Sequence, residues 1–220
     1  MTISTDADQT VVHAGELVRQ WKTPDGRNSF HYRIENPSRG WSSIASARYQ
    51  TRTFQQDGLP DVVVYFDPQH EPNVEFFAAA VHDAMEYFAE RYGPPPFESF
   101  RLAEQALHYD GFGSRSGMGF SSEVLGWKTD IDSNQGEDIR RMAALMVALN
   151  WWGDQIIPAN VAGAKILHAG LPYWSTAMYL HQIRDTEKDR NLRLQAMREM
   201  FRGRSKMVDK EAPFIEEFKD

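Results

Sequence analysis

The hydrophobic pattern of this chain is mainly strand-like at first and mainly helical later, and this order limits the folds open to it. β-Branched and aromatic residues cluster between turn sequences in the first third, as is typical of strands. We expect strands over residues 29–34, 44–53, 61–67, 99–103 and 117–121. Strands first and helices afterwards favour an α+β domain in which an N-terminal mixed sheet is followed by helices.

Helical spacing begins at Asn73, a residue type that often caps helix N-termini, and ends at Gly93 and the three prolines after it. A second helix is expected soon after residue 136. Its apolar positions from Ile139 to Leu149 form one continuous stripe, which predicts a dry inner face. Further helices are expected over residues 163–182 and 192–201.

Length and composition favour one large domain. The 220 residues are 41% hydrophobic and 12% aromatic, enough for a core without covalent cross-links. Residues 1–10 are polar and are expected to form a disordered tail. Residues 11–220 are expected to form a single domain.

Composition also excludes several functions. The chain has no cysteine, which excludes disulfides and thiolate metal sites. Its net charge of −7 argues against nucleic-acid binding, and the basic cluster of Arg198, Arg202, Arg204 and Lys206 is interpreted as a solvated helix end. No segment approaches the roughly 18 apolar residues of a membrane span, and no signal peptide is evident. The expected location is the cytoplasm, without membrane insertion.

One run of residues is too specific for an ordinary helix terminus. It reads Trp151-Trp152-Gly153-Asp154-Gln155-Ile156-Ile157-Pro158-Ala159-Asn160. The run resembles the segment after the metal-binding helix in the zinc aminopeptidases of the aminopeptidase N and leukotriene hydrolase family. The whole chain resembles more closely the peptidase-like domain fused to some bacterial ABC-transporter permeases. The resemblance implies a thermolysin-like (gluzincin) catalytic fold.

The resemblance also implies that the zinc site has been lost. In the family, an H-E-x-x-H helix supplies two zinc ligands and a general base. Those positions are Leu145, Met146 and Leu149 here, and the position of the third ligand is Ala169. None of these side chains holds zinc, so we expect no metal and no other cofactor.

Two further losses are implied by the same resemblance. The strand that binds the substrate's amine resembles residues 117–120, but the acidic residue expected beside it is Ser116. The position of the family's transition-state tyrosine is Glu217. The family's C-terminal helical domain, which would begin after Asp220, is expected to be absent.

The emptied cleft is itself a candidate site, because apolar walls with a few polar groups suit a small molecule. By resemblance its walls comprise Met118, Phe120, Leu145, Met146, Leu149, Ala169 and Trp174. His168, Tyr173 and Glu123 are the candidate general acids or bases. The simpler interpretation of Tyr173 and Trp174 is core packing.

Two functions remain open at this point. In the first, the chain binds or transforms a largely apolar small molecule, for example by cyclisation or rearrangement, as a cofactor-independent cyclase, isomerase or hydrolase. In the second, it is a catalytically dead pseudoenzyme that acts as a protein-interaction or transporter-associated subunit. A homodimer or a protein partner is expected to cover the face left by the missing domain. A metal site rebuilt from other histidines and a serine hydrolase are the weaker alternatives.

Overall fold

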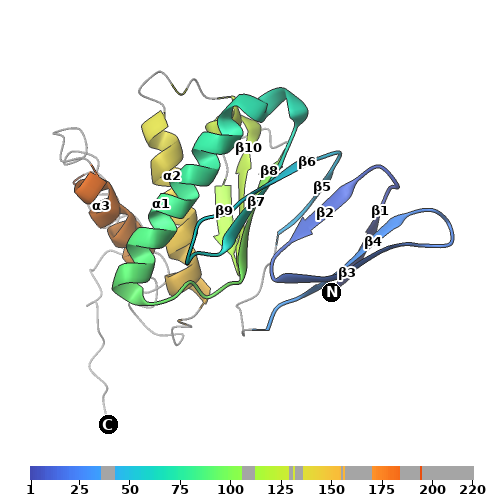
Figure 1. The fold of residues 1–220 in the computed structure, drawn as a ribbon, viewed down its shortest axis with the longest axis horizontal. Helices are drawn as coiled ribbons and strands as arrows, with labels where there is room; N and C mark the ends of the chain where they lie inside the picture. Colours follow the sequence, from blue (N-terminus) through green and yellow to red (C-terminus); the bar gives the residue numbers. More distant parts are fainter. Residues whose placement is uncertain are drawn as a thin grey trace, which may run out of the picture.

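The structure is a computed structural model that describes residues 1–35, 43–105, 112–128, 131, 136–154, 156, 170–183 and 194. Figure 1 shows strands of the N-terminal region on one side, a larger sheet in the middle and helices on the other side. The predicted α+β class is confirmed, and a helix over residues 74–92 lies between the strand that ends at Phe66 and the one that begins at Ser99. Among the described residues, none of the helices is long and apolar enough to cross a membrane.

Five strands form the N-terminal region. They are β1 (Thr2–Thr5), β2 (Thr10–His13), β3 (Glu16–Lys22), β4 (Asn28–Arg33) and β5 (Ile44–Ala47). Strands β1, β4 and β3 form an antiparallel sheet in that order, and β2 pairs with β5. The predicted strand over 44–53 is therefore divided, because its first half belongs to β5 and its second half to a different sheet.

The prediction of a disordered tail over residues 1–10 is wrong. Strand β1 pairs with β4 from Thr2, opposite His31, to Thr5, opposite Asn28. The α-amino group of Met1 donates a hydrogen bond to a backbone carbonyl of β4 at 2.6 Å. The partner strand lies about 25 residues downstream, so the polar composition of residues 1–10 gives no sign of it. Threonine itself suits a strand.

The central sheet has five strands in the order β6-β7-β8-β10-β9. They are β6 (Gln50–Phe54), β7 (Asp61–Phe66), β8 (Ser99–Gln105), β9 (Phe112–Arg115) and β10 (Met118–Ser122). The three inner strands β7, β8 and β10 run parallel, and the two outer strands are antiparallel to their neighbours. The expected mixed sheet is confirmed.

Helices cover one face of this sheet. They are α1 (Val74–Tyr92), α2 (Gly136–Leu149) and α3 (Leu171–Ile183), with the single turns η1 (Pro68–Asn73), η2 (Glu123–Trp127) and η3 (Asn150–Asp154). Figure 1 shows α1 and α2 beside the sheet, with α3 beyond them. The predicted first and second helices are confirmed. Of the predicted third helix the structure describes only its last part, and residues 192–201 lie outside the described residues except for Leu194.

Both faces of the central sheet are buried. Alternate residues of β7 and β8, among them Val64 and Leu102, join α1 and α2 in the main core. The residues between them, including Tyr65 and Ala103, pack with Val12 of β2 in a second core. Because side chains of a strand alternate between faces, each inner strand contributes to both cores.

Gly15 joins the N-terminal strands to the central sheet. Its backbone N–H donates to the carbonyl of Ser116 at 3.0 Å, and its own carbonyl accepts from the guanidinium of Arg101, which is buried in β8. Gly15 has a φ of 86°, and a Cβ at this position would meet the backbone of Arg33 and lie 2.7 Å from Cγ1 of Ile34. Only glycine fits this junction.

This geometry predicts different costs for two glycine substitutions. Gly26 has a similar φ of 84°, but no atom lies within 4 Å of the position that a Cβ would occupy, so it is the matched control. We expect Gly26→Ala to lower the free energy of unfolding by about 1–2 kcal/mol through backbone strain alone. Gly15→Ala adds a steric clash and should cost at least ~3 kcal/mol. Urea denaturation measures both, and equal costs would contradict the proposed junction.

Candidate site at the carboxyl edge of the parallel strands

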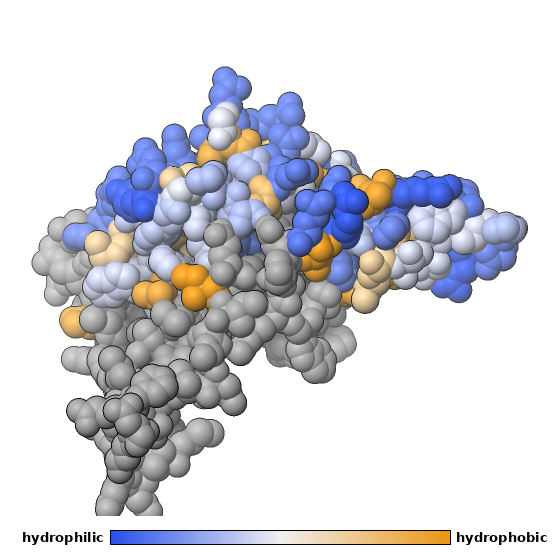
Figure 2. Space-filling view, turned by 90° about the horizontal axis from the view of Figure 1, so that it is seen from below, coloured by the Kyte–Doolittle hydropathy of each residue, from blue (hydrophilic) through white to orange (hydrophobic). Residues whose placement is uncertain are grey.

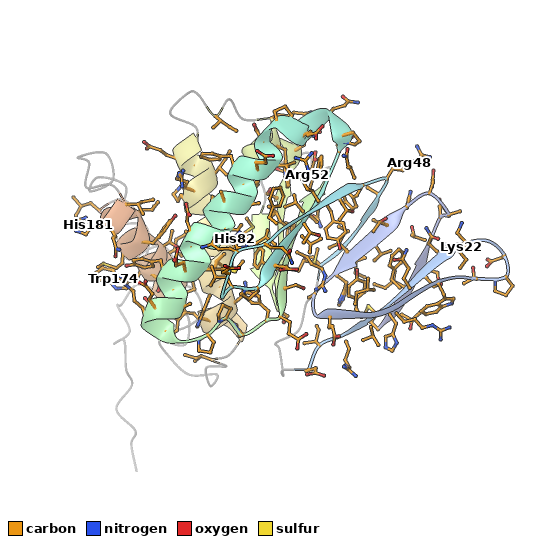
Figure 3. All side chains as sticks on the ribbon, in the orientation of Figure 1. Lys22, Arg48, Arg52, His82, Trp174 and His181 are labelled. Carbon is orange, nitrogen blue, oxygen red and sulfur yellow. The ribbon has the colours of Figure 1, made fainter. Side chains whose placement is uncertain are left out.

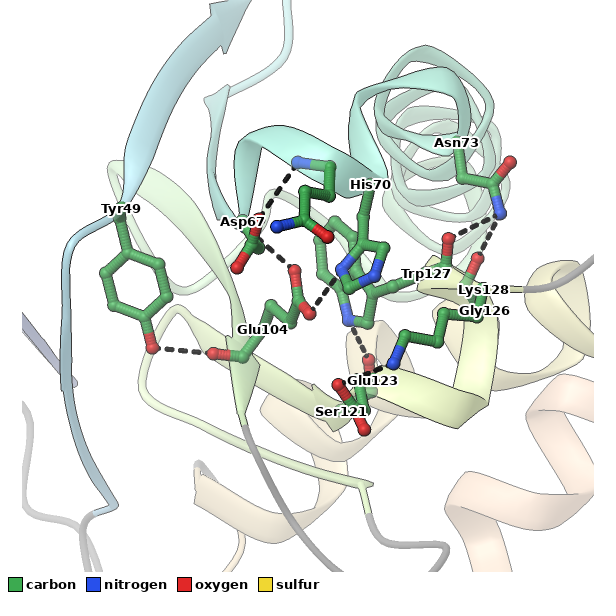
Figure 4. Close-up of polar contacts among 11 residues, drawn as sticks. Tyr49, Asp67, His70, Asn73, Glu104, Ser121, Glu123, Gly126, Trp127 and Lys128 are labelled. Carbon is green, nitrogen blue, oxygen red and sulfur yellow. Dashed lines mark hydrogen bonds and ion pairs between the residues drawn. The ribbon is translucent and has the colours of Figure 1, made fainter.

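Three acidic residues gather where the parallel strands end. Asp67 directly follows β7, Glu104 is the penultimate residue of β8, and Glu123 directly follows β10. The carboxyl ends of parallel strands meet at one edge of a sheet, and ligands of open α/β sheets bind at that edge. The turns η1 and η2 bring His70 and Lys128 to the same place, as Figure 4 shows.

Glu104 is the buried centre of this site. Its Oε2 accepts a hydrogen bond from the backbone N–H of Asp67 at 2.9 Å, and its Oε1 lies 2.7 Å from Nδ1 of His70. The hydroxyl of Tyr49 donates to the backbone carbonyl of Glu104 at 2.6 Å. Burial raises the pKa of the Glu104 carboxyl, and the Asp67 N–H and His70 oppose that shift. The strand therefore holds this carboxylate in a fixed position.

His70 is placed by the cap of η1. The Asp67 side chain accepts from the N–H of Gln69 at 2.9 Å, and the Asp67 carbonyl accepts from the N–H of His70 at 2.8 Å. Pro68 begins the turn, where its missing N–H costs nothing. Only 12% of the His70 side chain and 7% of the Glu104 side chain are exposed. The imidazole and the carboxylate are thus nearly enclosed together.

Glu123 completes the site from the solvent side. Its Oε2 lies 2.9 Å from Nζ of Lys128, and its backbone carbonyl accepts from the Lys128 N–H at 3.0 Å. One ligand-type atom each from His70, Glu104 and Glu123 lie within 4.8 Å of one another. Two carboxylates and an imidazole so close together can exchange protons or bind a cation.

Asn73 fixes η2 against the start of α1. Its side-chain amide donates to the carbonyls of Gly126 at 2.7 Å and Trp127 at 3.0 Å. The indole N–H of Trp127 in turn donates to the hydroxyl of Ser121 at 2.9 Å. The prediction that α1 begins at Asn73 is confirmed, since Asn73 is its N-cap residue, although its side chain makes no capping hydrogen bond and its amide is used by η2. Asn73 instead holds the turn that carries Glu123.

The structure divides the predicted pocket walls between two cores. Met118 and Phe120 of β10 pack on the side of the N-terminal strands, with Val12 and Tyr65. Met146 of α2 belongs to the core on the opposite face of the sheet. The prediction that these three side chains line one cleft is therefore wrong. The reason is that a sheet covered on both faces has apolar residues on both sides.

The positions implied for the lost zinc site lie on the C-terminal half of α2. Leu145 is 2% exposed, Met146 is fully buried, and Leu149 is half-buried. Ala169, the position implied for the third ligand, lies outside the described residues, as do His168 and Glu217. The basic cluster Arg198, Arg202, Arg204 and Lys206 also lies outside them.

The three candidate acid or base residues do not form one described group. Glu123 lies at the carboxyl edge of the sheet. Tyr173 and Trp174 are at the start of α3 and are exposed, so the expectation that they are packed in the core is wrong. Figure 3 shows Trp174 on α3, at the end of the molecule opposite the N-terminal strands. Of the two members of the predicted trio that the structure describes, Glu123 is the one that lies beside other acid-base groups.

The tryptophans of the distinctive run have structural roles. Trp151 is buried against Phe88 and Phe97. The indole N–H of Trp152 donates to the hydroxyl of Ser175 in α3 at 2.9 Å, so this pair joins the end of α2 to α3. The segment 117–120 is likewise an inner part of the sheet, since β9 forms its edge, and Ser116 lies in the turn between β9 and β10 with a φ of 46°.

Sequence reasoning missed His70, Glu104 and Lys128. His70 and Glu104 are 34 residues apart, and no short motif connects them. The one available signal was an acidic residue at the end of each of three strands, which becomes informative only once those strands are known to be parallel.

Removal of the Asn73 amide tests the frame of the site. Asn73→Ala removes one donor from each of two buried carbonyls, so we expect a loss of about 2–4 kcal/mol in the free energy of unfolding. Asn28 is the matched control, because its amide also donates to two backbone carbonyls, but the bond to Ala7 is exposed and the bond to Gln9 is only partly buried. Water replaces that donor in Asn28→Ala, so the loss should stay under about 1 kcal/mol. Thermal or urea unfolding compares them, and a smaller loss for Asn73→Ala would refute the assigned role.

Comparison with known proteins supports the fold. No family model matches the sequence, and no curated protein matches it. Among solved structures, aminopeptidase A of Legionella pneumophila, solved in complex with aspartic acid, superposes with a TM-score of 0.72 at 14% sequence identity. The match covers 82% of this chain and 22% of that enzyme, so the chain spans about a fifth of the length of the protein it matches. The chain therefore has an aminopeptidase-like fold.

Proposed function

We propose that this chain is a zinc-free derivative of a thermolysin-like (gluzincin) aminopeptidase domain and does not hydrolyse peptides. The fold is that of part of an aminopeptidase. The resemblance of the Trp151–Asn160 run to the aminopeptidase N family supports the finer assignment. The positions that carry the zinc chemistry in that family have different side chains here.

The burial of Leu145 and Met146 is the observation that carries this proposal. A catalytic zinc needs three nitrogen or oxygen ligands and an open fourth position. Leu145 supplies no such atom and is 2% exposed. Met146, at the position of the general base, is buried where a Cβ on Gly119 would lie 3.0 Å from its sulfur. Buried apolar side chains therefore stand at two of the positions on α2 that the zinc chemistry would need.

For the function itself, we favour the binding or transformation of a largely apolar small molecule. Glu123 supports this choice, because it is a predicted acid or base and lies beside an imidazole and a second carboxylate. A cyclisation or rearrangement needs proton transfer, and groups of this kind carry it out. The site of this activity would be the carboxyl edge of the sheet rather than the cleft beside α2. The cytoplasm is the proposed location.

A protein-interaction role is the second candidate, and one observation favours it. Tyr173 and Trp174 are neighbouring aromatic residues on α3, 45% and 49% exposed, and aromatic side chains of this kind are common at interfaces. The hydrophobic groups visible among the coloured residues of Figure 2 are scattered over a mostly hydrophilic surface, so a broad apolar interface is not apparent on that face. A homodimer or a protein partner contacting α3 belongs to this second candidate.

Peptidase activity is the first test. The purified chain should show no zinc-dependent release of fluorophore from a panel of aminoacyl-coumarin amides, with an active zinc aminopeptidase as the positive control. The reason is the absence of a zinc ligand at Leu145 and Leu149. Turnover that requires zinc and persists in a His70→Gln variant would refute the proposal, because that variant removes an imidazole carried by η1 and leaves α2 unchanged.

Native mass spectrometry distinguishes the two candidate functions. The small-molecule function predicts a chain that retains an organic adduct of constant mass, with no change in the Trp174→Ala variant. The interaction function predicts a dimer or a complex with a second protein, weakened by Trp174→Ala because truncation of an exposed aromatic anchor removes contact area. A bare monomer of both proteins would contradict both candidates.

A further inference from the structure

We propose that His70, Glu104 and Glu123 form a binding site for one divalent transition-metal ion. The site lies at the carboxyl edge of β7, β8 and β10, whereas the zinc position of the resembled family would lie on the C-terminal half of α2. It therefore differs from the family's site in its residues and in the element that carries them. The prediction that the chain binds no metal would then apply only to the zinc position on α2.

The three donors have the right chemistry and are close together. They are one imidazole nitrogen and two carboxylate oxygens, which lie within 4.8 Å of one another. Metal bonds of about 2.0–2.2 Å place two donors of one ion no more than about 4.2 Å apart. The donors need to move together by roughly 1 Å, a distance that rotation of one carboxylate covers. Glu123 is suited to that movement, because its side chain is 38% exposed.

The other two donors are already held in place. The N–H of Asp67 orients the Glu104 carboxylate, and the bond from Tyr49 fixes the backbone of Glu104. His70 is held by the capped turn η1. Hydrogen bonds that orient the ligands in this way are characteristic of metal sites in proteins and contribute to metal affinity. Two rigid donors and one adjustable donor make a site that needs little reorganisation.

The burial of Glu104 supplies an independent argument. A carboxylate that is 7% exposed has lost most of its hydration, and this loss is costly unless a positive charge or several donors replace the water. One of its oxygens accepts from a backbone N–H, and the other contacts the His70 ring. A divalent cation between Glu104 and Glu123 provides the compensating charge at the point where both carboxylates converge.

Lys128 competes with such an ion for the carboxylate of Glu123. Its ammonium group lies 2.9 Å from the Glu123 carboxylate, on the solvent side of the site, and its side chain is 48% exposed. A divalent ion bound to the same carboxylate would repel the ammonium group, so metal binding displaces Lys128 into solvent. The two kinds of substitution should therefore change the metal affinity in opposite directions. Removal of the lysine should strengthen metal binding, and removal of any donor should weaken it.

The donor set favours particular metals. Imidazole with carboxylates suits zinc, cobalt, manganese or ferrous iron, whereas calcium and magnesium prefer sites made entirely of oxygen. Three protein donors leave at least one coordination position for water or for a ligand. We commit to zinc and cobalt as the probes, because zinc reports affinity and cobalt reports geometry through its visible spectrum.

The test titrates ZnCl2 calorimetrically, and CoCl2 spectroscopically, into the full chain after removal of metals by a chelator. We expect one ion per chain, with zinc bound at least tenfold more tightly than calcium or magnesium. His70→Gln and Glu123→Gln should each weaken zinc binding by about tenfold or more. Lys128→Gln should tighten it several-fold. His31→Gln is the control, since it removes a half-buried imidazole from β4 and should change nothing.

Several results would overturn the site. They are the absence of stoichiometric zinc binding to the folded wild-type chain, unchanged affinity in both His70→Gln and Glu123→Gln, and weaker binding in Lys128→Gln. Circular dichroism and thermal unfolding in the presence of chelator identify any variant that fails to fold. Zinc should raise the unfolding temperature of the wild-type chain but not that of Glu123→Gln, which keeps the shape of the side chain. An equal rise in both proteins would also refute the proposal.

Discussion

The three parallel strands β7, β8 and β10, buried on both faces, are the constraint on which the rest of the structure depends. Buried parallel strands must be covered on each side, and here α1 and α2 cover one face while the N-terminal strands cover the other. The join between the layers needs Gly15 and the buried guanidinium of Arg101. The same arrangement ends all three strands at one edge. The polar side chains that follow them are therefore brought together by the sheet, whatever their separation in the sequence.

Hydrophobic periodicity was enough to predict the helices that show their buried face in their own sequence. The apolar spacing from Val74 to Phe88 and from Ile139 to Leu149 predicted α1 and α2 correctly, because an amphipathic helix shows its buried face locally. The errors fell where distant partners decide. Residues 2–5 form a strand because β1 pairs with β4, and β2 begins at Thr10 because it pairs with β5. Asn73 is the N-cap residue of α1, as its position suggested, but its side-chain amide donates to two carbonyls of η2 that the local sequence does not reveal.

The candidate site was less predictable than the fold for a related reason. Met118, Phe120 and Met146 looked alike in the sequence, but Met118 and Phe120 face the N-terminal strands from β10, whereas Met146 lies on α2 at the opposite face of the sheet. These side chains can therefore be assigned to two different cores only once the sheet is known. Glu123 was singled out from the sequence as an acidic residue of interest, whereas its neighbours His70 and Glu104 were missed. They lie on η1 and β8, and only the parallel pairing of β7 with β8 brings them together.

The two regions of this molecule considered as metal sites differ in the polarity of their buried side chains. On α2, the buried side chains of Leu145 and Met146 are apolar and offer an ion no ligand. At the carboxyl edge, a carboxylate remains buried at Glu104, although an apolar residue of similar size would remove its desolvation cost. Such a group is stable in a fold when other groups offset that cost, and here Asp67, His70 and Tyr49 all hold its position. Three contacts that orient one acid toward a second acid favour a role in binding for this edge of the sheet. By the same reasoning, the apolar C-terminal half of α2 serves to pack the domain.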